Sequence, residues 1–299
     1  FAVFYVLGDF KTNEDYMLYF HSLKKNCVTG YTYASIVGGQ TANTEFELLT
    51  GNTLGFLSAG TTAFQLYIHG QMPSLVSNLK AEGYSGNKAM HPFNPYNYNR
   101  PAVYKDFGFT DFIDKFDFPK NVKRVREYIS DEANVDRIIS EYEKNRKKTD
   151  QPFYMYNMTI QNHSPYDKDA ANFKQPIKIE SSKYDAEANR YLNLIKYSDD
   201  SLKQLTGYFE KCKEPTIILF LGDHQPRLTD EFMNKITNGQ YQTWNSEQMM
   251  KRYQVPFVIW ANYDIKEQHI EKTSMNYIQS ILTKTAGVKM TGYQRFLNE

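Results

Sequence analysis

A carboxylate and an imidazole stand side by side directly after a strand-like apolar run. Residues 216–221 are followed by Gly222, Asp223 and His224. An Asp and a His at the end of a strand form a compact pair of ligands for a divalent cation. The same residues could instead form a turn in which the Asp caps the next segment. Both interpretations stay open from the local sequence.

A second histidine follows a second strand-like run. Residues 153–160 are typical of a strand, and His163 comes three positions later in the segment Gln-Asn-His-Ser-Pro. One His in such a place is usually part of a polar loop. Two His-bearing strand ends in one chain make a shared cleft more plausible, because ligands of α/β proteins bind beyond the carboxyl ends of the strands.

Two glycines precede a hydroxyl residue where a helix is expected to begin. Gly38 and Gly39 lead to Thr41. The free N–H groups of a helix N-terminus favour an anion at such a place. Alternatively a Thr only caps the helix, and Thr44 with Glu47 fits a capping box. A capping residue can also be a nucleophile, so the two interpretations are compatible.

A polar, irregular segment in the middle of the chain carries further candidates. It is rich in Asn, Pro and Tyr and contains His91, Tyr98 and Arg100. An Arg among aromatic residues suits the phosphate group of a ligand. An exposed Arg that stacks on a Tyr is the alternative.

The elements that must position these residues alternate along the chain. Apolar residues at helical spacing predict helices, and short apolar runs predict strands. The runs 216–221 and 255–261 lack alternation, which indicates strands buried on both faces. We therefore expect an α/β sandwich with a central, mixed and mostly parallel sheet flanked by helices. The expected helices are residues 15–25, 41–49, 131–148, 185–212 and 273–286, and the expected strands are 31–37, 153–160, 216–221 and 255–261.

Composition narrows the class of protein. The chain has 299 residues, with 35 Lys and Arg against 34 Asp and Glu. This length suits one large domain, and a net charge of +1 argues against binding nucleic acid through bulk electrostatics. Cys27 and Cys212 form no CxxC pair, which excludes a zinc knuckle. Two buried thiols are a better interpretation than a disulfide.

Four motifs in order carry a resemblance to a known family. GGQTANTEFE, YNRPAVYKDFGF, NHSPY and FLGDHQP together resemble the extracellular catalytic domain of the lipoteichoic acid synthase family. These enzymes are phosphoglycerol transferases of the alkaline phosphatase and sulfatase superfamily. VLGDFKTNEDYM is similar to the entry segment of that domain, and the resemblance runs from about Val6 to Trp260. It implies one sulfatase-like catalytic domain over residues 1–299, with a small C-terminal subdomain of about 40 residues.

The resemblance also implies roles for individual residues. Thr41 falls on the nucleophile, which also binds the metal, and Asp223 and His224 fall on ligands of the same cation. Mn²⁺ or Mg²⁺ is implied, with Zn²⁺ as a further candidate.

The remaining family positions contact the substrate. His163 and Arg100 fall on residues that contact the transferred phosphate group. Tyr98 stands where the family often has Trp, and His91 falls on a His near the same cleft.

The chain departs from the family pattern at its beginning. Phe1 aligns just after a Glu that is a metal ligand in the family, so three of the four expected ligands are present. Either the first strand precedes this sequence, or residues 1–6 are that strand and Asp9 replaces the Glu. The spacing of the entry segment favours the first alternative.

The resemblance implies a membrane-associated envelope enzyme that acts as a monomer. It would move glycerol phosphate from phosphatidylglycerol to lipoteichoic acid or a polysaccharide through a covalent Thr intermediate. It would lie on the extracellular face of a bacterial membrane, held by an N-terminal anchor outside this sequence, with no nucleic acid partner. The alternatives are a phosphodiesterase or phosphoethanolamine transferase of the same superfamily, and a non-catalytic ectodomain that binds teichoic acid or lipid headgroups.

Overall fold

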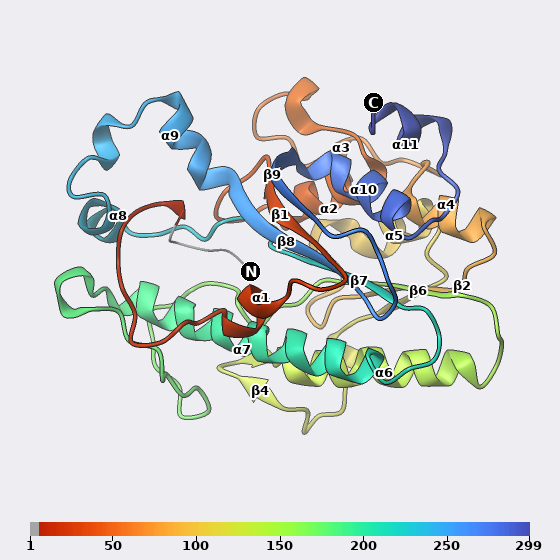
Figure 1. Ribbon diagram of the computed structural model, residues 1–299, viewed down its shortest axis with the longest axis horizontal. Helices are drawn as coiled ribbons and strands as arrows, with labels where there is room; N and C mark the ends of the chain where they lie inside the picture. Colours follow the sequence, from red (N-terminus) through yellow and green to blue (C-terminus); the bar gives the residue numbers. More distant parts are fainter. Residues whose placement is uncertain (1–5) are drawn as a thin grey trace. The chain divides into compact units, whose positions relative to one another are not determined.

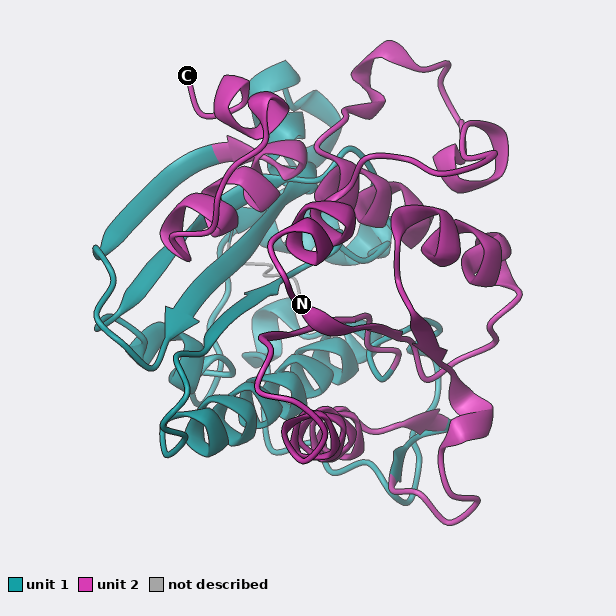
Figure 2. Ribbon diagram, turned by 90° about the vertical axis from the view of Figure 1, so that its right-hand side faces the viewer, with its two compact units in different colours: residues 1–39, 124–127, 161–272 teal, residues 40–123, 128–160, 273–299 magenta. Residues whose placement is uncertain are grey.

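The computed structural model describes residues 6–299, which divide into two compact units (Figures 1 and 2). Unit 1 contains residues 6–39, 124–127 and 161–272 of the described chain. Unit 2 contains residues 40–123, 128–160 and 273–299. The predicted site residues are divided between the two units.

Unit 1 is built on a four-stranded sheet in the order β7-β8-β1-β9. β8 runs antiparallel to both β1 and β7. It lies between them, and all but its first residue are buried. β7 is only half-buried, because it is the outer strand of this sheet. The prediction of burial on both faces is thus confirmed for β8, and it is wrong for β7. The strands are β1 (Cys27–Tyr33), β7 (Ile217–Leu221), β8 (Gln254–Ala261) and β9 (Gln268–Ser274).

One long helix dominates the helical part of unit 1. α7 lies along one side of the sheet (Figures 1 and 2). Its N-cap is Asp185, whose side chain accepts from the N–H of Ala188. Its apolar stripe, including Tyr191, Leu194 and Ile195, is buried as its spacing predicts. The helices are α1 (Leu18–Ser22), α7 (Ala186–Phe209), α8 (Asp230–Ile236) and α9 (Ser246–Met250), with 3₁₀ turns η5 (Ser181–Lys183), η6 (Tyr241–Thr243) and η7 (Lys251–Tyr253), and the short strand β4 (Arg124–Val125).

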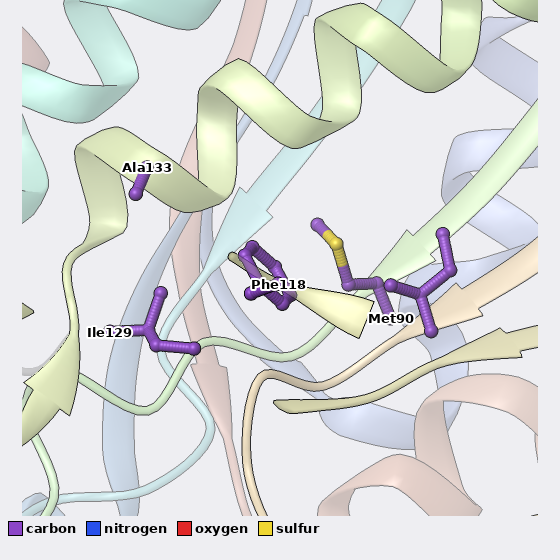
Figure 3. Close-up of a cluster of buried hydrophobic side chains, with 5 residues drawn as sticks. Met90, Phe118, Ile129 and Ala133 are labelled. Carbon is purple, nitrogen blue, oxygen red and sulfur yellow. The ribbon is translucent and has the colours of Figure 1, made fainter. Parts of the chain in front are cut away.

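Unit 2 contains a three-stranded parallel sheet in the order β3-β2-β6. Met90, at the end of β2, packs with Phe118, Ile129 and Ala133 in a buried cluster that Figure 3 shows. Ile113 completes this cluster. The strands are β2 (Ser85–Met90), β3 (Asp111–Ile113), β5 (Tyr128–Ile129) and β6 (Phe153–Asn157).

The helices of unit 2 begin and end at recognisable signals. α6 starts at the N-cap Ser130 and has Asp131 and Glu132 in its first turn, where acidic side chains are favoured. α2 ends at Gly51 in the left-handed conformation. The helices are α2 (Thr41–Thr50), α3 (Ala63–Leu66), α4 (Leu75–Ala81), α5 (Arg100–Phe107), α6 (Asp131–Arg146), α10 (Ile278–Thr285) and α11 (Gly292–Phe296), with 3₁₀ turns η2 (Leu54–Phe56), η3 (Asn97–Asn99), η4 (Lys115–Asp117) and η8 (Met275–Tyr277).

The predicted α/β class with a mixed sheet is confirmed, while several boundaries differ. The helix expected at 15–25 is only α1, and the strand expected at 31–37 is β1, which starts and ends earlier. No disulfide joins Cys27 and Cys212, as expected, although Cys212 is half-buried rather than buried. The alternative first strand at 1–6 lies, except for Val6, outside the described residues. Within residues 6–299, no helix has the length and apolarity that a membrane span requires.

Candidate active site

The segment before Thr41 has an unusual backbone. Gly38, Gly39 and Gln40 have φ angles of +74°, +152° and +59°, and α2 begins at Thr41. A left-handed conformation is easy for Gly but costs Gln about 1–2 kcal/mol. Strained turns of this kind cluster at functional sites, and this one places Thr41 in the first turn of the helix, where the dipole favours an anion.

The capping alternative for this helix is wrong. The N-cap of α2 is Gln40, which makes no side-chain capping hydrogen bond. Thr44 lies inside the helix and is buried. Glu47 does not cap the N-terminus either, because its carboxylate accepts from the backbone N–H of Leu54.

Arg100 also begins a helix directly after left-handed residues. Tyr98 and Asn99 have φ angles of +60° and +56°, and α5 starts at Arg100. Tyr98 is half-buried, and its ring centroid lies 5.1 Å from the Arg100 guanidinium carbon, within the range of a cation–π contact. Both predicted residues on helix N-termini, Thr41 and Arg100, are thus held by locally strained backbone.

The Arg100 guanidinium is buried and paired with a carboxylate that the sequence interpretation did not identify. Its Nε and Nη2 donate to Glu45 Oε1 at 3.1 and 2.6 Å. The side chains of Arg100 and Glu45 are 2% and 0% exposed. Tyr104 donates to the other carboxylate oxygen at 2.5 Å. Glu45 lies four residues after Thr41 on α2, which places both side chains on the same helix face.

The Arg100 fork also bonds outside the Glu45 carboxylate. Nη1 donates to the Asn97 carbonyl at 3.4 Å. The guanidinium further interacts with the Tyr104 hydroxyl. Burial by itself lowers the pKa of Arg100, but the Glu45 carboxylate outweighs it, and the pKa lies above the usual value. Arg100 is therefore a buried, permanent cation that Glu45, Tyr104 and Asn97 hold in place.

His91 lies at the end of β2 in unit 2. It is 4% exposed, and its Nδ1 lies 3.0 Å from the carbonyl oxygen of Met158. A hydrogen bond of this type fixes the ring orientation and tautomer, with Nδ1 as the donor. The His91 ring therefore has a fixed orientation and is not a mobile surface side chain.

The Asp-His pair lies in unit 1, just beyond the carboxyl end of β7. Asp223 Oδ2 is 3.1 Å from His224 Nε2. The other ring nitrogen, Nδ1, is 2.9 Å from the carbonyl oxygen of Gln225 and donates to it. With Nδ1 protonated, Nε2 of a neutral ring carries a lone pair beside the carboxylate oxygen. Two electron-rich atoms this close need a proton or a cation between them.

The chemistry of this pair fits a divalent cation. Neighbouring ligands of an octahedral cation, each at about 2.1 Å from it, lie about 3.0 Å apart, close to the 3.1 Å between Asp223 Oδ2 and His224 Nε2. A ligating His usually donates its second N–H to a backbone carbonyl, as His224 does to Gln225. Across residues 6–299, no three His, Cys, Asp or Glu side chains gather into a metal site by themselves.

The loop that carries His163 is held by a second residue that the sequence interpretation missed. His163 is exposed, and its Nδ1 lies 2.7 Å from the Ser164 carbonyl oxygen. Arg126, from the segment after β4, donates to the carbonyl oxygens of Gln161, His163 and Pro165 at 2.8, 2.7 and 2.6 Å. Arg126 has a left-handed φ of +55°. A fork that binds three carbonyls fixes the path of the loop.

The structure therefore brings together two groups of predicted residues. In unit 2, Tyr98 and Arg100 contact each other, and Glu45 links Arg100 to the helix of Thr41. In unit 1, Asp223 and His224 form a pair, while His163 lies on its own loop. The sequence contains one indication of the role of Glu45, because a carboxylate on a buried helix needs a cation as its partner. Arg126 had no local signal.

Comparisons with known proteins place the chain among enzymes of one superfamily. The sulfatase family model matches residues 5–288. A relative from Rhizobium meliloti (strain 1021), named putative cyclic beta-1,2-glucan modification protein, is 33% identical over 278 residues, which are 90% of this chain and 42% of that protein. Lipoteichoic acid synthase of Staphylococcus aureus (strain USA300) is 28% identical over 196 residues, which are 62% of this chain and 28% of that protein.

A solved structure supports the fold. The phosphoglycerol transferase GacH of Streptococcus pyogenes, in complex with sn-glycerol-1-phosphate, superposes with a TM-score of 0.82 at 20% identity. The match covers 100% of this chain and 75% of that chain. These findings confirm the predicted resemblance and fold, and the chain spans less than half the length of both relatives named above.

Proposed function

The chain belongs to the sulfatase family, and we propose that it is a phosphoglycerol transferase. It takes glycerol phosphate from phosphatidylglycerol and transfers it to a hydroxyl group of a cell-envelope acceptor. The reaction takes place on the extracellular side of the membrane. Thr41 is the nucleophile, and the phosphoglycerol group is carried on it between donor and acceptor.

The relatives support the reaction and favour one class of acceptor. Two similar proteins are named as a lipoteichoic acid synthase and a phosphoglycerol transferase. The relative at 33% identity is named for modification of a glucan. The acceptor that this combination favours is a glycan hydroxyl, with a growing glycerol phosphate polymer as the second candidate.

The observation that best supports the proposed site is one backbone carbonyl that accepts two hydrogen bonds. The Gln225 carbonyl oxygen accepts from the N–H of Gly38 at 2.8 Å and from His224 Nδ1 at 2.9 Å. Val37 also pairs with Gln225 in a parallel bridge. Gly38 is three residues before Thr41, a separation that an extended chain spans in at most about 11 Å. The turn that leads to the nucleophile is thus tied to the residue that orients a cation ligand.

The proposed roles follow from the chemistry of each side chain. Thr41 Oγ1 attacks phosphorus, the bond between phosphorus and the diacylglycerol oxygen breaks, and that oxygen receives the proton that Thr41 loses. The acceptor hydroxyl then attacks phosphorus, loses its proton and releases Thr41. The Arg100 guanidinium binds non-bridging phosphate oxygens, and His163 stabilises charge on the same group. Phosphoryl transfer asks mainly for such positioning and electrostatics.

Asp223 and His224 would hold a divalent cation, Mn²⁺ or Mg²⁺, together with Thr41. Members of this superfamily usually use a divalent metal. When bound, the cation supplies positive charge that favours the deprotonated nucleophile and neutralises phosphate oxygens.

The test uses phosphatidylglycerol vesicles, Mn²⁺ and a β-1,2-glucan acceptor. We expect diacylglycerol release with phosphoglycerol appearing on the glucan. Thr41→Ala should lower the rate by more than about a thousandfold, while Thr41→Ser, which keeps a hydroxyl, should retain measurable turnover. Diacylglycerol release by Thr41→Ala at the wild-type rate would refute the proposal. Release of free glycerol phosphate, equal with and without acceptor, would indicate a phosphodiesterase.

A further inference from the structure

Two segments of unit 2 lack charged residues altogether. Residues 48–79 and 92–99 contain no Asp, Glu, Lys or Arg. Charged residues make up 23% of the chain, so about nine would be expected in forty residues of average composition. The first segment runs from the end of α2 to α4, and the second leads into Arg100.

The two uncharged segments touch and expose apolar side chains. α3, from the first segment, contacts η3, from the second. Leu66 and Tyr67, at the end of α3, are 59% and 49% exposed, and Tyr96, next to η3, is 78% exposed. Phe56, on the loop that leads to α3, is 92% exposed. We name Phe56, Leu66, Tyr67 and Tyr96 the apolar surface.

The second uncharged segment leads directly into Arg100. η3 ends at Asn99, and the next residue is Arg100. Tyr98, within η3, stacks on the Arg100 guanidinium, which is itself 2% exposed. The residues of η3 thus join the exposed Tyr96 to the candidate phosphate-binding residue.

The chemistry of the apolar surface favours a lipid bilayer over a glycan. Single exposed apolar residues are ordinary, but their combination with forty uncharged residues is not. Tyr side chains favour the boundary between headgroups and hydrocarbon, and Phe and Leu favour the hydrocarbon next to it. A sugar needs hydrogen-bonding partners, which the side chains of Phe56 and Leu66 lack. Burying a charged side chain in hydrocarbon costs free energy, and both segments lack charged residues.

We propose that residues 48–79 and 92–99 form a membrane-docking surface that rests in the headgroup layer of a phospholipid bilayer. This inference rests on the proposed function, because only a lipid donor requires the phosphate site to meet a bilayer. Docking through Phe56, Leu66, Tyr67 and Tyr96 places the segment that leads to Arg100 against the headgroups. The docking depends on apolar contact, so anionic lipid and salt have little effect on it.

The test is co-sedimentation of the 299-residue chain with phosphatidylcholine vesicles, with and without phosphatidylglycerol. The triple variant Phe56→Ser, Leu66→Ser, Tyr67→Ser should bind at least about tenfold more weakly. The matched control is Phe116→Ser. Phe116 is 72% exposed but lies in η4, beside Lys115 and Asp117. The control should bind as the wild type does.

Several results would overturn the proposal. These are no binding by the wild type, wild-type binding by the triple variant, equal loss in the control, or binding that salt abolishes. A separate assay keeps the proposed function distinguishable. With short-chain phosphatidylglycerol as dispersed monomers, the triple variant should keep wild-type turnover. A wild-type chain that binds vesicles but does not turn over this substrate would contradict the function and not the docking surface.

Discussion

At the scale of single residues, the most informative contact is the buried pair of Glu45 and Arg100. The carboxylate binds the edge of the guanidinium that carries Nε and Nη2. Tyr104 completes the carboxylate's hydrogen bonds, and burial, followed by the Glu45 charge, raises the pKa of this phenol well above its usual value. Glu45 therefore fixes the orientation of the Arg100 guanidinium, the proposed phosphate-binding group.

Replacement of Glu45 tests this role. Glu45→Gln leaves a buried guanidinium without its counter-charge, which should lower the free energy of unfolding by roughly 3 kcal/mol. It should also lower kcat/KM for phosphatidylglycerol by at least about tenfold. The matched control is Glu47→Gln, on the same helix and equally buried, whose carboxylate binds a backbone N–H of the following loop. Equal kcat/KM in the two variants would show that Glu45 is only structural.

The Arg126 fork allows a second prediction. Arg126→Lys keeps the charge, but an ammonium group cannot reproduce a planar fork to three carbonyls. We expect kcat/KM to fall about tenfold through a displaced His163, with little change in thermal stability. Arg124→Lys is the control, because the Arg124 side chain is exposed and donates to the Glu127 carbonyl of its own turn rather than to the His163 loop. If both variants behave like the wild type, Arg126 does not position the loop.

At the scale of elements, periodicity predicts the long helices well. α2, α6 and α7 lie where apolar spacing and glycine signals predict them. The predicted boundaries of β1 and α1 differ more from the structure, because Tyr- and Thr-rich segments suit both strands and loops. β7 is half-buried although its sequence is fully apolar, because burial depends on its place in the sheet and not on its composition.

α6 also carries a buried charge cluster with a defined pH dependence. Glu141, 4% exposed, binds Lys88, Arg137 and Lys144. Burial alone would raise the pKa of Glu141, but the bonds from Lys88 and Lys144 outweigh it and lower the pKa from 4.5 to about 2. A lowered pKa stabilises the folded state above pH 4.5, and this contribution is lost as the pH falls towards 2.

Glu141→Gln should therefore lower the free energy of unfolding at pH 7 by on the order of 3 kcal/mol. The difference from the wild type should shrink between pH 4.5 and pH 2. Urea unfolding across this range measures both quantities. Glu143→Gln, at an exposed position of the same helix, should change stability by less than about 0.5 kcal/mol at every pH. A Glu141→Gln effect that does not depend on pH would contradict the proposed ion pairs.

At the scale of the whole molecule, the four ordered motifs predict the fold and the family, and the structure adds the contacts between them. Glu45 and Arg100 are 55 residues apart, and no local pattern encodes their pairing. The same holds for the Gln225 carbonyl, which joins the turn before Thr41 to His224. Motifs identify candidate site residues, whereas such long-range bonds to carbonyls and carboxylates depend on the folded chain.

The most direct test of the central claim is a search for the covalent intermediate on Thr41. The chain is incubated with phosphatidylglycerol and Mn²⁺ without acceptor, quenched in acid, digested and analysed by mass spectrometry. We predict that the peptide with Thr41 gains the mass of one phosphoglycerol group, and that this mass disappears when a glucan acceptor is added before the quench. Turnover without such an adduct, or an adduct on another residue that persists in Thr41→Ala, would contradict the account.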